Sequence, residues 1–219
     1  MKKVTFIIIM AVFYQGSWAQ TNSATGITKF AAVMKENLLR LDTAAHPATY
    51  AVLANNFERA AETAKTFWQP FYYASLCHAI MAMGVKEKDK IDPLAAKAEA
   101  LLEKAIVLSP DNSEILALQA MIVNTRILAD PMARWKDYSV QSTELLKRSR
   151  EQDPANPRPY LIEARTKLFT PGALGGGADA ARPAITEALT RFKQFKPADD
   201  MAPVWGQAQA EKLSQSLNK

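Results

Sequence analysis

Apolar residues recur every three or four positions along most of the chain, which is the spacing of one face of an α-helix. In the first such segment these positions are Ile27, Phe30, Ala31, Met34, Leu38 and Leu41. The same spacing continues over 50–64 and over 94–105. Asp92 and Pro93 predict the start of the latter helix, as an N-cap followed by a proline in the first turn. Strand alternation is absent after residue 20, so the pattern predicts an all-α protein.

Prolines divide the chain at a nearly constant interval. Pro70, Pro110, Pro154 and Pro197 follow one another at separations of 40, 44 and 43 residues. Each proline is expected to end one helix and to precede the next, with short loops at about 85–92, 129–132, 170–178 and 196–202. A two-helix unit of this length cannot bury its apolar face alone, so neighbouring units are predicted to stack.

The second helix of these units resembles the tetratricopeptide repeat, which places a small, a large apolar and a small residue before a proline. The matching sets are Ala98, Leu102, Ala105 and Pro110, then Ser142, Leu146, Ser149 and Pro154. A third set, Ile185, Leu189, Phe192 and Pro197, keeps only the large residue and the proline. In the first helix of a unit, the matching pairs are Leu116 with Ala120 and Tyr160 with Ala164. The resemblance is best over 93–169.

The resemblance and the repeat together predict the fold. We expect an all-α, helix-turn-helix repeat solenoid of about nine helices, with elongated repeats of about 40–44 residues and a last helix that contains Trp205. Val123 and Ser142 lie further apart than the family pattern allows, as do Lys167 and Ile185. The extra residues are therefore expected in the turns between the two helices of a unit, along one edge of the array.

The first residues are typical of a secretory signal. Lys2 and Lys3 precede an apolar run over 4–13, which is shorter than the roughly 20 residues that a membrane span needs. Small residues at Ser17 and Ala19 predict cleavage between Ala19 and Gln20. The sequence thus predicts a signal peptide over 1–19 and one tetratricopeptide-like domain over 20–219. The protein is expected in the periplasm or secreted, without a stable membrane anchor.

Composition limits the kinds of binding and catalytic site that the chain can form. The chain has 27 basic and 22 acidic residues, a balance that does not favour nucleic-acid binding. One cysteine and two histidines predict neither a disulfide framework nor a metal site. Cys77 and His78 are adjacent, and successive side chains diverge on a helix, so they are not expected to form a nucleophile–base pair. Both lie in an apolar run, so both are expected to be buried. We predict no catalytic residue, no cofactor and no enzyme activity.

The main functional hypothesis is a non-enzymatic scaffold that binds another protein or peptide, either on its concave face or along the turn edge. The candidate residues are Asp130, Arg134, Trp135, Tyr138, Thr170, Pro171, Gly175, Gly176 and Gly177. Trp135 is either an exposed anchor or packs beneath its turn. The glycine run lacks the lysine and the preceding strand of a phosphate-binding loop, which favours an irregular turn.

The alternative hypothesis is a small-molecule-binding subunit of a transport or sensing system, with a pocket between repeats. Aromatic residues over 67–73 are interpreted as a packing seam, or else as the wall of such a groove. The groove candidates are Tyr72, Tyr73, Gln119 and Glu163. The sequence makes no prediction of the oligomeric state.

Overall fold

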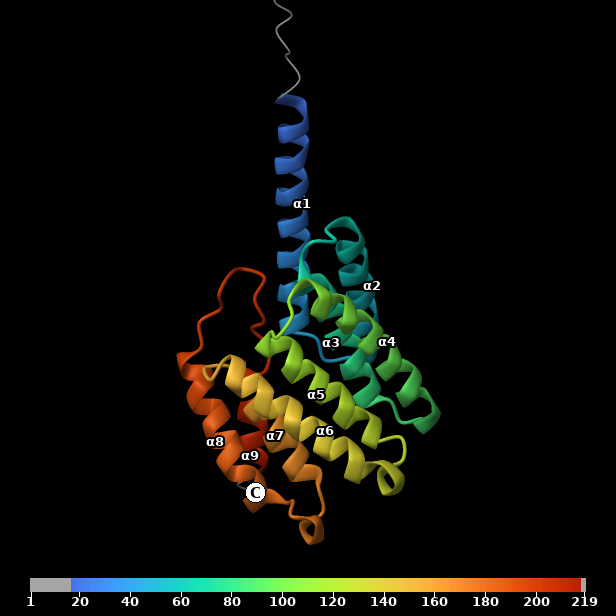
Figure 1. The fold of residues 1–219 in the computed structure, drawn as a ribbon, viewed down its shortest axis with the longest axis vertical. Helices are drawn as coiled ribbons and strands as arrows, with labels where there is room; N and C mark the ends of the chain where they lie inside the picture. The colour runs from blue at the N-terminus through green and yellow to red at the C-terminus, as the bar shows by residue number, and fades with distance from the viewer. Residues whose placement is uncertain (1–16, 218–219) are drawn as a thin grey trace, which may run out of the picture.

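The computed structural model describes residues 17–217, with side chains described from residue 27 onward. These residues form nine α-helices and one short 3-10 helix, without a strand (Figure 1). In chain order the elements are α1 (Ser17–Asp42), α2 (Pro47–Thr63), α3 (Trp68–Gly84), α4 (Lys88–Leu108), α5 (Ser113–Ile127), α6 (Pro131–Gln152), α7 (Arg158–Phe169), η1 (Gly172–Leu174), α8 (Ala178–Gln194) and α9 (Gln207–Ser216). The predicted all-α, helix-turn-helix architecture is confirmed.

Each helix packs against the next one in the chain, and α3, α5 and α7 also pack side by side. We call α3, α5 and α7 the inner helices, and α2, α4, α6 and α8 the outer helices. The first part of α1 projects beyond the other helices (Figure 1). Consecutive pairing of this kind buries one apolar face of each outer helix, whereas the inner helices α3 and α5 are buried on most sides.

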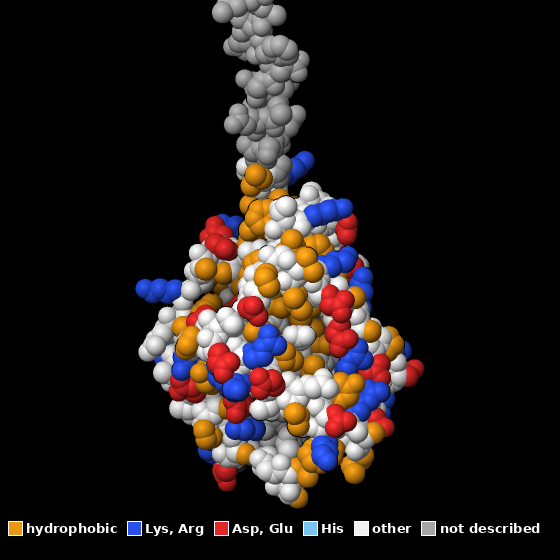
Figure 2. Space-filling model, in the orientation of Figure 1, with side chains coloured by type: hydrophobic (Ala, Val, Ile, Leu, Met, Phe, Trp, Pro, Cys, Tyr) orange, Lys and Arg blue, Asp and Glu red, His pale blue; other side chains and the backbone are white. Residues whose placement is uncertain are grey.

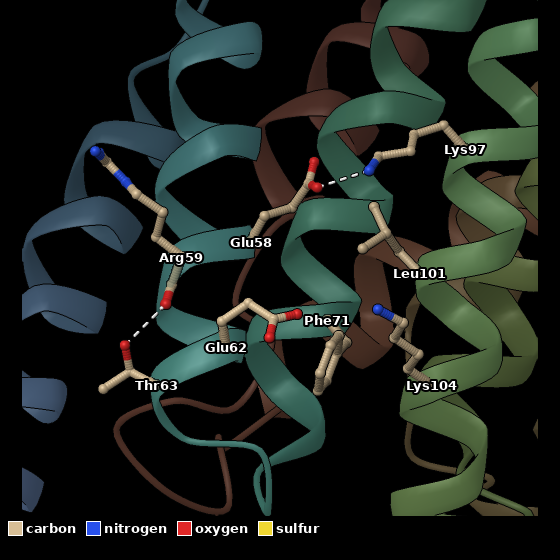
Figure 3. A pocket seen from close by; sticks show the side chains of 8 residues that line it. All are labelled: Glu58, Arg59, Glu62, Thr63, Phe71, Lys97, Leu101 and Lys104. Atoms are coloured by element: carbon tan, nitrogen blue, oxygen red, sulfur yellow. Dashed lines mark hydrogen bonds and ion pairs between the residues drawn. The ribbon is translucent and has the colours of Figure 1, made fainter.

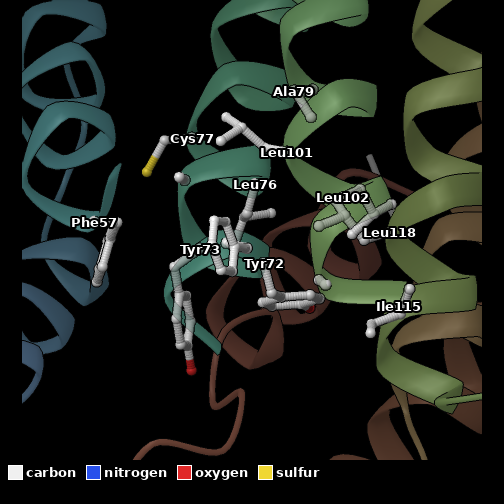
Figure 4. Close-up of a cluster of buried hydrophobic side chains, with 14 of the residues drawn as sticks. Phe57, Tyr72, Tyr73, Leu76, Cys77, Ala79, Leu101, Leu102, Ile115 and Leu118 are labelled. Atoms are coloured by element: carbon white, nitrogen blue, oxygen red, sulfur yellow. The ribbon is translucent and has the colours of Figure 1, made fainter. Parts of the chain in front are cut away.

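The core lies between the inner and outer helices. Around α3, Phe57 of α2 stacks on Tyr73 at 5.2 Å between ring centroids, and Leu102 of α4 packs into the same cluster (Figure 4). A second, smaller cluster joins α7, α8 and α9. Trp205 packs against both clusters and so links the two halves of the molecule.

Two prolines lie elsewhere in their helices than the sequence predicted. Pro70 does not separate two helices but is the third residue of α3, and Pro93 does not open a helix but is the sixth residue of α4, which begins at Lys88. At Pro70 the physical reason is that amides in the first turn of a helix have no intrahelical partner, so a proline there removes little.

The expected insertion at the turns is also partly wrong. Only residues 128–130 separate α5 from α6, because most of the extra residues extend α6, which is 22 residues long. The longer connection at 170–177 between α7 and α8 agrees with the prediction.

The predicted signal peptide lies mostly outside the described residues. Helix α1 begins at Ser17 and continues through the predicted cleavage point between Ala19 and Gln20. Within the described part of the chain, none of the helices combines the length and the hydropathy that a membrane span requires.

Residues 195–206, which connect α8 to α9, form a segment that we call the C-terminal strap. It lies across the inner helices: the Tyr73 hydroxyl donates a hydrogen bond to the carbonyl of Met201 at 3.0 Å, and the Arg158 guanidinium donates to the carbonyl of Pro203. Trp205 belongs to this strap and not to the last helix, which corrects the sequence prediction.

The strap ends at Gly206, which has a left-handed φ of 116°. A Cβ atom at this position would lie 2.6 Å from Cζ of Phe192 and 3.2 Å from Cδ2 of Leu161. Both the backbone conformation and the close packing therefore require glycine here.

Replacing Trp205 by alanine is expected to lower the free energy of unfolding by about 2–4 kcal/mol, because its ring packs against both clusters. Its neighbour Val204 is 49% exposed, so Val204→Ala is the matched control and is expected to change stability by less than about 0.5 kcal/mol. Urea unfolding followed by circular dichroism measures both values. Equal effects of the two substitutions would contradict the role given to the strap.

Candidate functional site

The predicted groove at Tyr72 and Tyr73 is filled by the strap. Both side chains are buried, and the Trp205 indole nitrogen donates a hydrogen bond to the Tyr72 hydroxyl at 2.8 Å. Glu163, another groove candidate, faces α6 and pairs with Arg150 at 2.6 Å. The fourth, Gln119, is half-buried on α5. The side chains of Tyr72 and Tyr73 are thus engaged by other parts of the same chain.

A buried ion pair holds the strap in place. Arg158 of α7 has no exposed surface, and one of its guanidinium nitrogens lies 2.6 Å from Oε1 of Glu114 on α5. Its guanidinium also lies 4.8 Å from the ring centre of Phe195 and 5.3 Å from that of Trp205. Burial raises the pKa of Glu114 to about 7, although the charge of Arg158 opposes this shift. The sequence analysis did not identify this pair, since its members are 44 residues apart.

Four candidates for partner binding lie at the start of α6: Asp130, Arg134, Trp135 and Tyr138. Asp130 caps the helix, accepting a hydrogen bond from the amide of Ala133 at 3.2 Å. Arg134 pairs with Asp92 of α4 at 2.7 Å. Trp135 is 38% exposed. Asp130 therefore caps α6, and Arg134 links α6 to α4.

The other candidates lie in the α7–α8 connection: Thr170, Pro171, Gly175, Gly176 and Gly177. Gly175 and Gly177 have φ values of 80° and 100°. A Cβ atom at Gly176 would lie 2.0 Å from the carbonyl oxygen of Thr170. These requirements fit the irregular turn that the sequence favoured, in which each glycine has a conformational role.

A cleft of about 440 Å³ lies between α2 and α4, beside the start of α3; we call it the α2–α4 cleft (Figure 3). Its lining residues are Glu58, Arg59, Glu62, Thr63, Phe71, Lys97, Leu101 and Lys104. Lys97, Leu101 and Lys104 share one face of α4, because helical neighbours recur at intervals of three and four residues. The volume lies within the range of ordinary small-molecule sites.

Charged side chains of both signs line the α2–α4 cleft, and Arg59 shares the α2 wall with two glutamates. Glu58 and Glu62 project from α2, whereas Lys97 and Lys104 project from α4 (Figure 3). Glu58 and Lys97 pair at 2.7 Å across the cleft, and the ammonium group of Lys104 lies 5.5 Å from the ring centre of Phe71. The arrangement places the ammonium group of Lys104 beside an aromatic ring, which suits a ligand that combines an apolar part with acidic groups.

A neighbouring cleft of about 500 Å³ separates α1 from α2; we call it the α1–α2 cleft. Its apolar lining is formed by Phe30, Val33 and Ala60, and it shares Arg59 and Thr63 with the α2–α4 cleft. The two clefts therefore lie on either side of α2.

The described residues do not contain a cluster of three or more histidine, cysteine, aspartate or glutamate side chains that could hold a metal ion. Cys77 is fully buried, and burial raises the pKa of its thiol to about 12, which keeps it protonated and unreactive. Charged side chains of both signs are mixed over the face seen in Figure 2. The mixed charge of this face and the unreactive thiol favour non-covalent binding of a ligand in a cleft.

Of the residues that line the α2–α4 cleft, Phe71 belongs to the aromatic segment over 67–73 that the sequence marks as a possible groove wall. The charged walls were not predicted, although the spacing of Lys97, Leu101 and Lys104 is visible in the sequence. The expectation for His78 was only partly correct: its side chain is 13% exposed and pairs with Glu58, which lines the cleft.

Comparisons with known proteins give one informative relative. No protein-family model and no curated protein matches the sequence. Among solved structures, the chain is similar to the HusA haemophore from Porphyromonas gingivalis, with 35% sequence identity and a TM-score of 0.76. The match covers 86% of this chain and 92% of that chain.

This relative contradicts the main functional hypothesis. A haemophore is a carrier of haem, a small ligand, and not a scaffold for a partner protein, so the prediction of a protein–protein interaction module is wrong. The small-molecule alternative agrees with the relative. The prediction that the chain is not an enzyme is confirmed, since a haemophore is a binding protein.

The buried Glu114 predicts an unusual pH dependence of stability. Its pKa of about 7 in the folded protein exceeds the ordinary glutamate value of 4.5. Between pH 4.5 and pH 7 the folded state therefore binds a proton that the unfolded state has lost. The free energy of unfolding is therefore expected to rise as the pH falls from 7.5 to about 5. Glu114→Gln, which cannot titrate, is expected to lack this rise in urea unfolding.

An exposed glutamate on α6 provides the control, since Glu144→Gln is expected to keep the wild-type slope. A wild-type free energy of unfolding that decreases as the pH falls from 7.5 to about 5 would show that Glu114 is ionised in the folded protein.

Proposed function

We propose that this chain, which belongs to the same family as the HusA haemophore of Porphyromonas gingivalis, is itself a non-enzymatic haem-binding protein. The observation that carries the proposal is the relationship to HusA, which extends over most of both chains. We further propose that the protein is exported, to the periplasm or out of the cell, because the sequence over 1–19 is typical of a signal peptide.

We place the haem in the α2–α4 cleft. Haem is a flat, largely apolar macrocycle that carries two propionate groups at one edge and iron at its centre. Lys97 and Lys104 provide two cations on one wall for the propionates, and Arg59 provides a third on the other wall. Phe71 and Leu101, which are 6% and 4% exposed, form the apolar floor of the cleft beneath the macrocycle. Ligand sites of this kind combine apolar surface with a few charged groups that fix orientation.

The α1–α2 cleft is the rival location, since it is somewhat larger and less charged. The arrangement of its cations favours the α2–α4 cleft. Each cleft has one cation more than it has carboxylates, but only in the α2–α4 cleft do two cations, Lys97 and Lys104, lie on one wall beside an aromatic ring.

Charge reversal on α4 tests the location. Lys104→Glu is expected to weaken haem binding on the order of tenfold, because it replaces an attractive charge near the propionates by a repulsive one. Titration of the purified chain with haem, followed by absorbance, measures the affinity. Lys212→Glu makes the same charge change on the exposed surface of α9 and is expected to leave the affinity unchanged.

Val33→Glu introduces a charge into the rival α1–α2 cleft. Loss of affinity in this variant, with Lys104→Glu unaffected, would move the site to that cleft. Failure of the wild-type chain to bind haem would contradict the proposed function itself.

A further inference from the structure

The two lysines of the α2–α4 cleft differ in the partners that they already have. The Lys97 ammonium group donates a hydrogen bond to Oε2 of Glu58 at 2.7 Å, so its charge is compensated within the protein (Figure 3). Lys104 lies against the ring of Phe71, and within the described part of the chain it forms no ion pair. A ligand carboxylate can therefore pair with Lys104 directly, whereas Lys97 is already occupied.

Glu58 is fixed in position and charged before a ligand enters. Its other carboxylate oxygen, Oε1, lies 3.0 Å from Nε2 of His78, whose side chain is 13% exposed. Burial raises the pKa of Glu58, but its bonds to Lys97 and His78 keep the pKa below the ordinary value. The carboxylate is therefore ionised at neutral pH and directed at Lys97 by a second contact behind it.

Haem would bring two carboxylates to these two lysines. Lys97 and Lys104 are two helical turns apart, which is roughly 10 Å along the axis of α4, so their flexible side chains can reach two acidic groups at one edge of a ligand. The Lys97 side chain is 48% exposed and accessible to such a group. A carboxylate that binds Lys97 must nevertheless displace Glu58, so the gain from the new ion pair is offset by the loss of the existing one.

We propose that Glu58 determines the specificity of the α2–α4 cleft by competing with the ligand for Lys97, so that the cleft binds only one ligand carboxylate strongly, at Lys104. This inference rests on the proposed function. The second propionate of haem exchanges one carboxylate for another at Lys97, and the exchange moves no proton because both groups are ionised. The cleft is thus suited to a ligand with an apolar body and a single well-bound acidic group, and a further acidic group adds little affinity.

The test compares haem with its monomethyl and dimethyl esters, which differ from haem only in the number of free carboxylates. Absorbance titration of the wild-type chain is expected to give affinities for haem and the monoester that agree within about twofold, whereas the diester, which cannot pair with Lys104, binds on the order of tenfold more weakly. Glu58→Gln keeps the shape of the side chain but releases the charge of Lys97. It is expected to bind haem on the order of fivefold more tightly, the factor that a partly exposed ion pair contributes, and to leave the affinity for the diester unchanged.

Glu62→Gln is the matched control, because it removes the same charge from the same wall of the cleft. Glu62 pairs with Lys65 at 3.6 Å and not with a lysine of α4. This substitution is therefore expected to raise the affinity for haem by less than about twofold.

A double-mutant cycle isolates the competition. Lys97→Met removes the cation for which Glu58 and the ligand compete, so adding Glu58→Gln to this variant is expected to give no more than the effect of Glu62→Gln. A fivefold gain that persists without Lys97 would show that Glu58 acts by general repulsion of the ligand, and would overturn the inference.

The remaining outcomes separate the inference from the proposed function. Equal effects of Glu58→Gln and Glu62→Gln on haem, or equal gains for haem and its dimethyl ester, would overturn the inference and leave the proposed function intact. Wild-type affinity that is much higher for haem than for the monoester would also overturn it, because the second propionate would then have a partner that Glu58 does not contest. If the wild-type chain binds none of the three compounds, the proposed function fails, and the inference fails with it.

Discussion

The fully buried guanidinium of Arg158 is the interaction on which the arrangement of this molecule depends. It pairs with Glu114 of α5, donates a hydrogen bond to the strap at Pro203 and lies against the rings of Phe195 and Trp205. A buried guanidinium is costly unless it is hydrogen-bonded, so removal of the Glu114 side chain would leave Arg158 without its partner on α5. The position of the strap over the inner helices follows from this requirement.

The strap determines which surfaces can receive a ligand. Because it fills the inner face over Tyr72 and Tyr73, the aromatic residues that most suggest a binding groove in the sequence serve as core. The clefts lie instead on either side of α2, where charged side chains line the walls. Glu58 lines the α2–α4 cleft, where it pairs with the exposed Lys97 and with the largely buried His78.

The sequence predicted the outer helices well because each of them buries one apolar face, and the spacing of that face is visible over a few residues. It placed helix starts less well: Pro93 predicts a helix start, yet α4 begins five residues earlier, at Lys88. The site was harder to predict. Glu58 and Lys97 are 39 residues apart, and Arg158 and Glu114 are 44 apart, so their pairing depends on how the units stack. The main functional hypothesis is overturned by the relationship to the haemophore. It took Arg134 as an exposed anchor, whereas in the fold Arg134 pairs with Asp92.

The central claim is that the ligand occupies the outer α2–α4 cleft while the strap stays closed over the inner face. Backbone amide chemical shifts of the isotope-labelled chain, recorded during titration with the diamagnetic zinc protoporphyrin, test it most directly. The account predicts shift changes in α2 around Glu58 and in α4 from Lys97 to Lys104, with the amides of the strap unchanged. Changes concentrated in the strap and in α7, with none in α2 and α4, would contradict it.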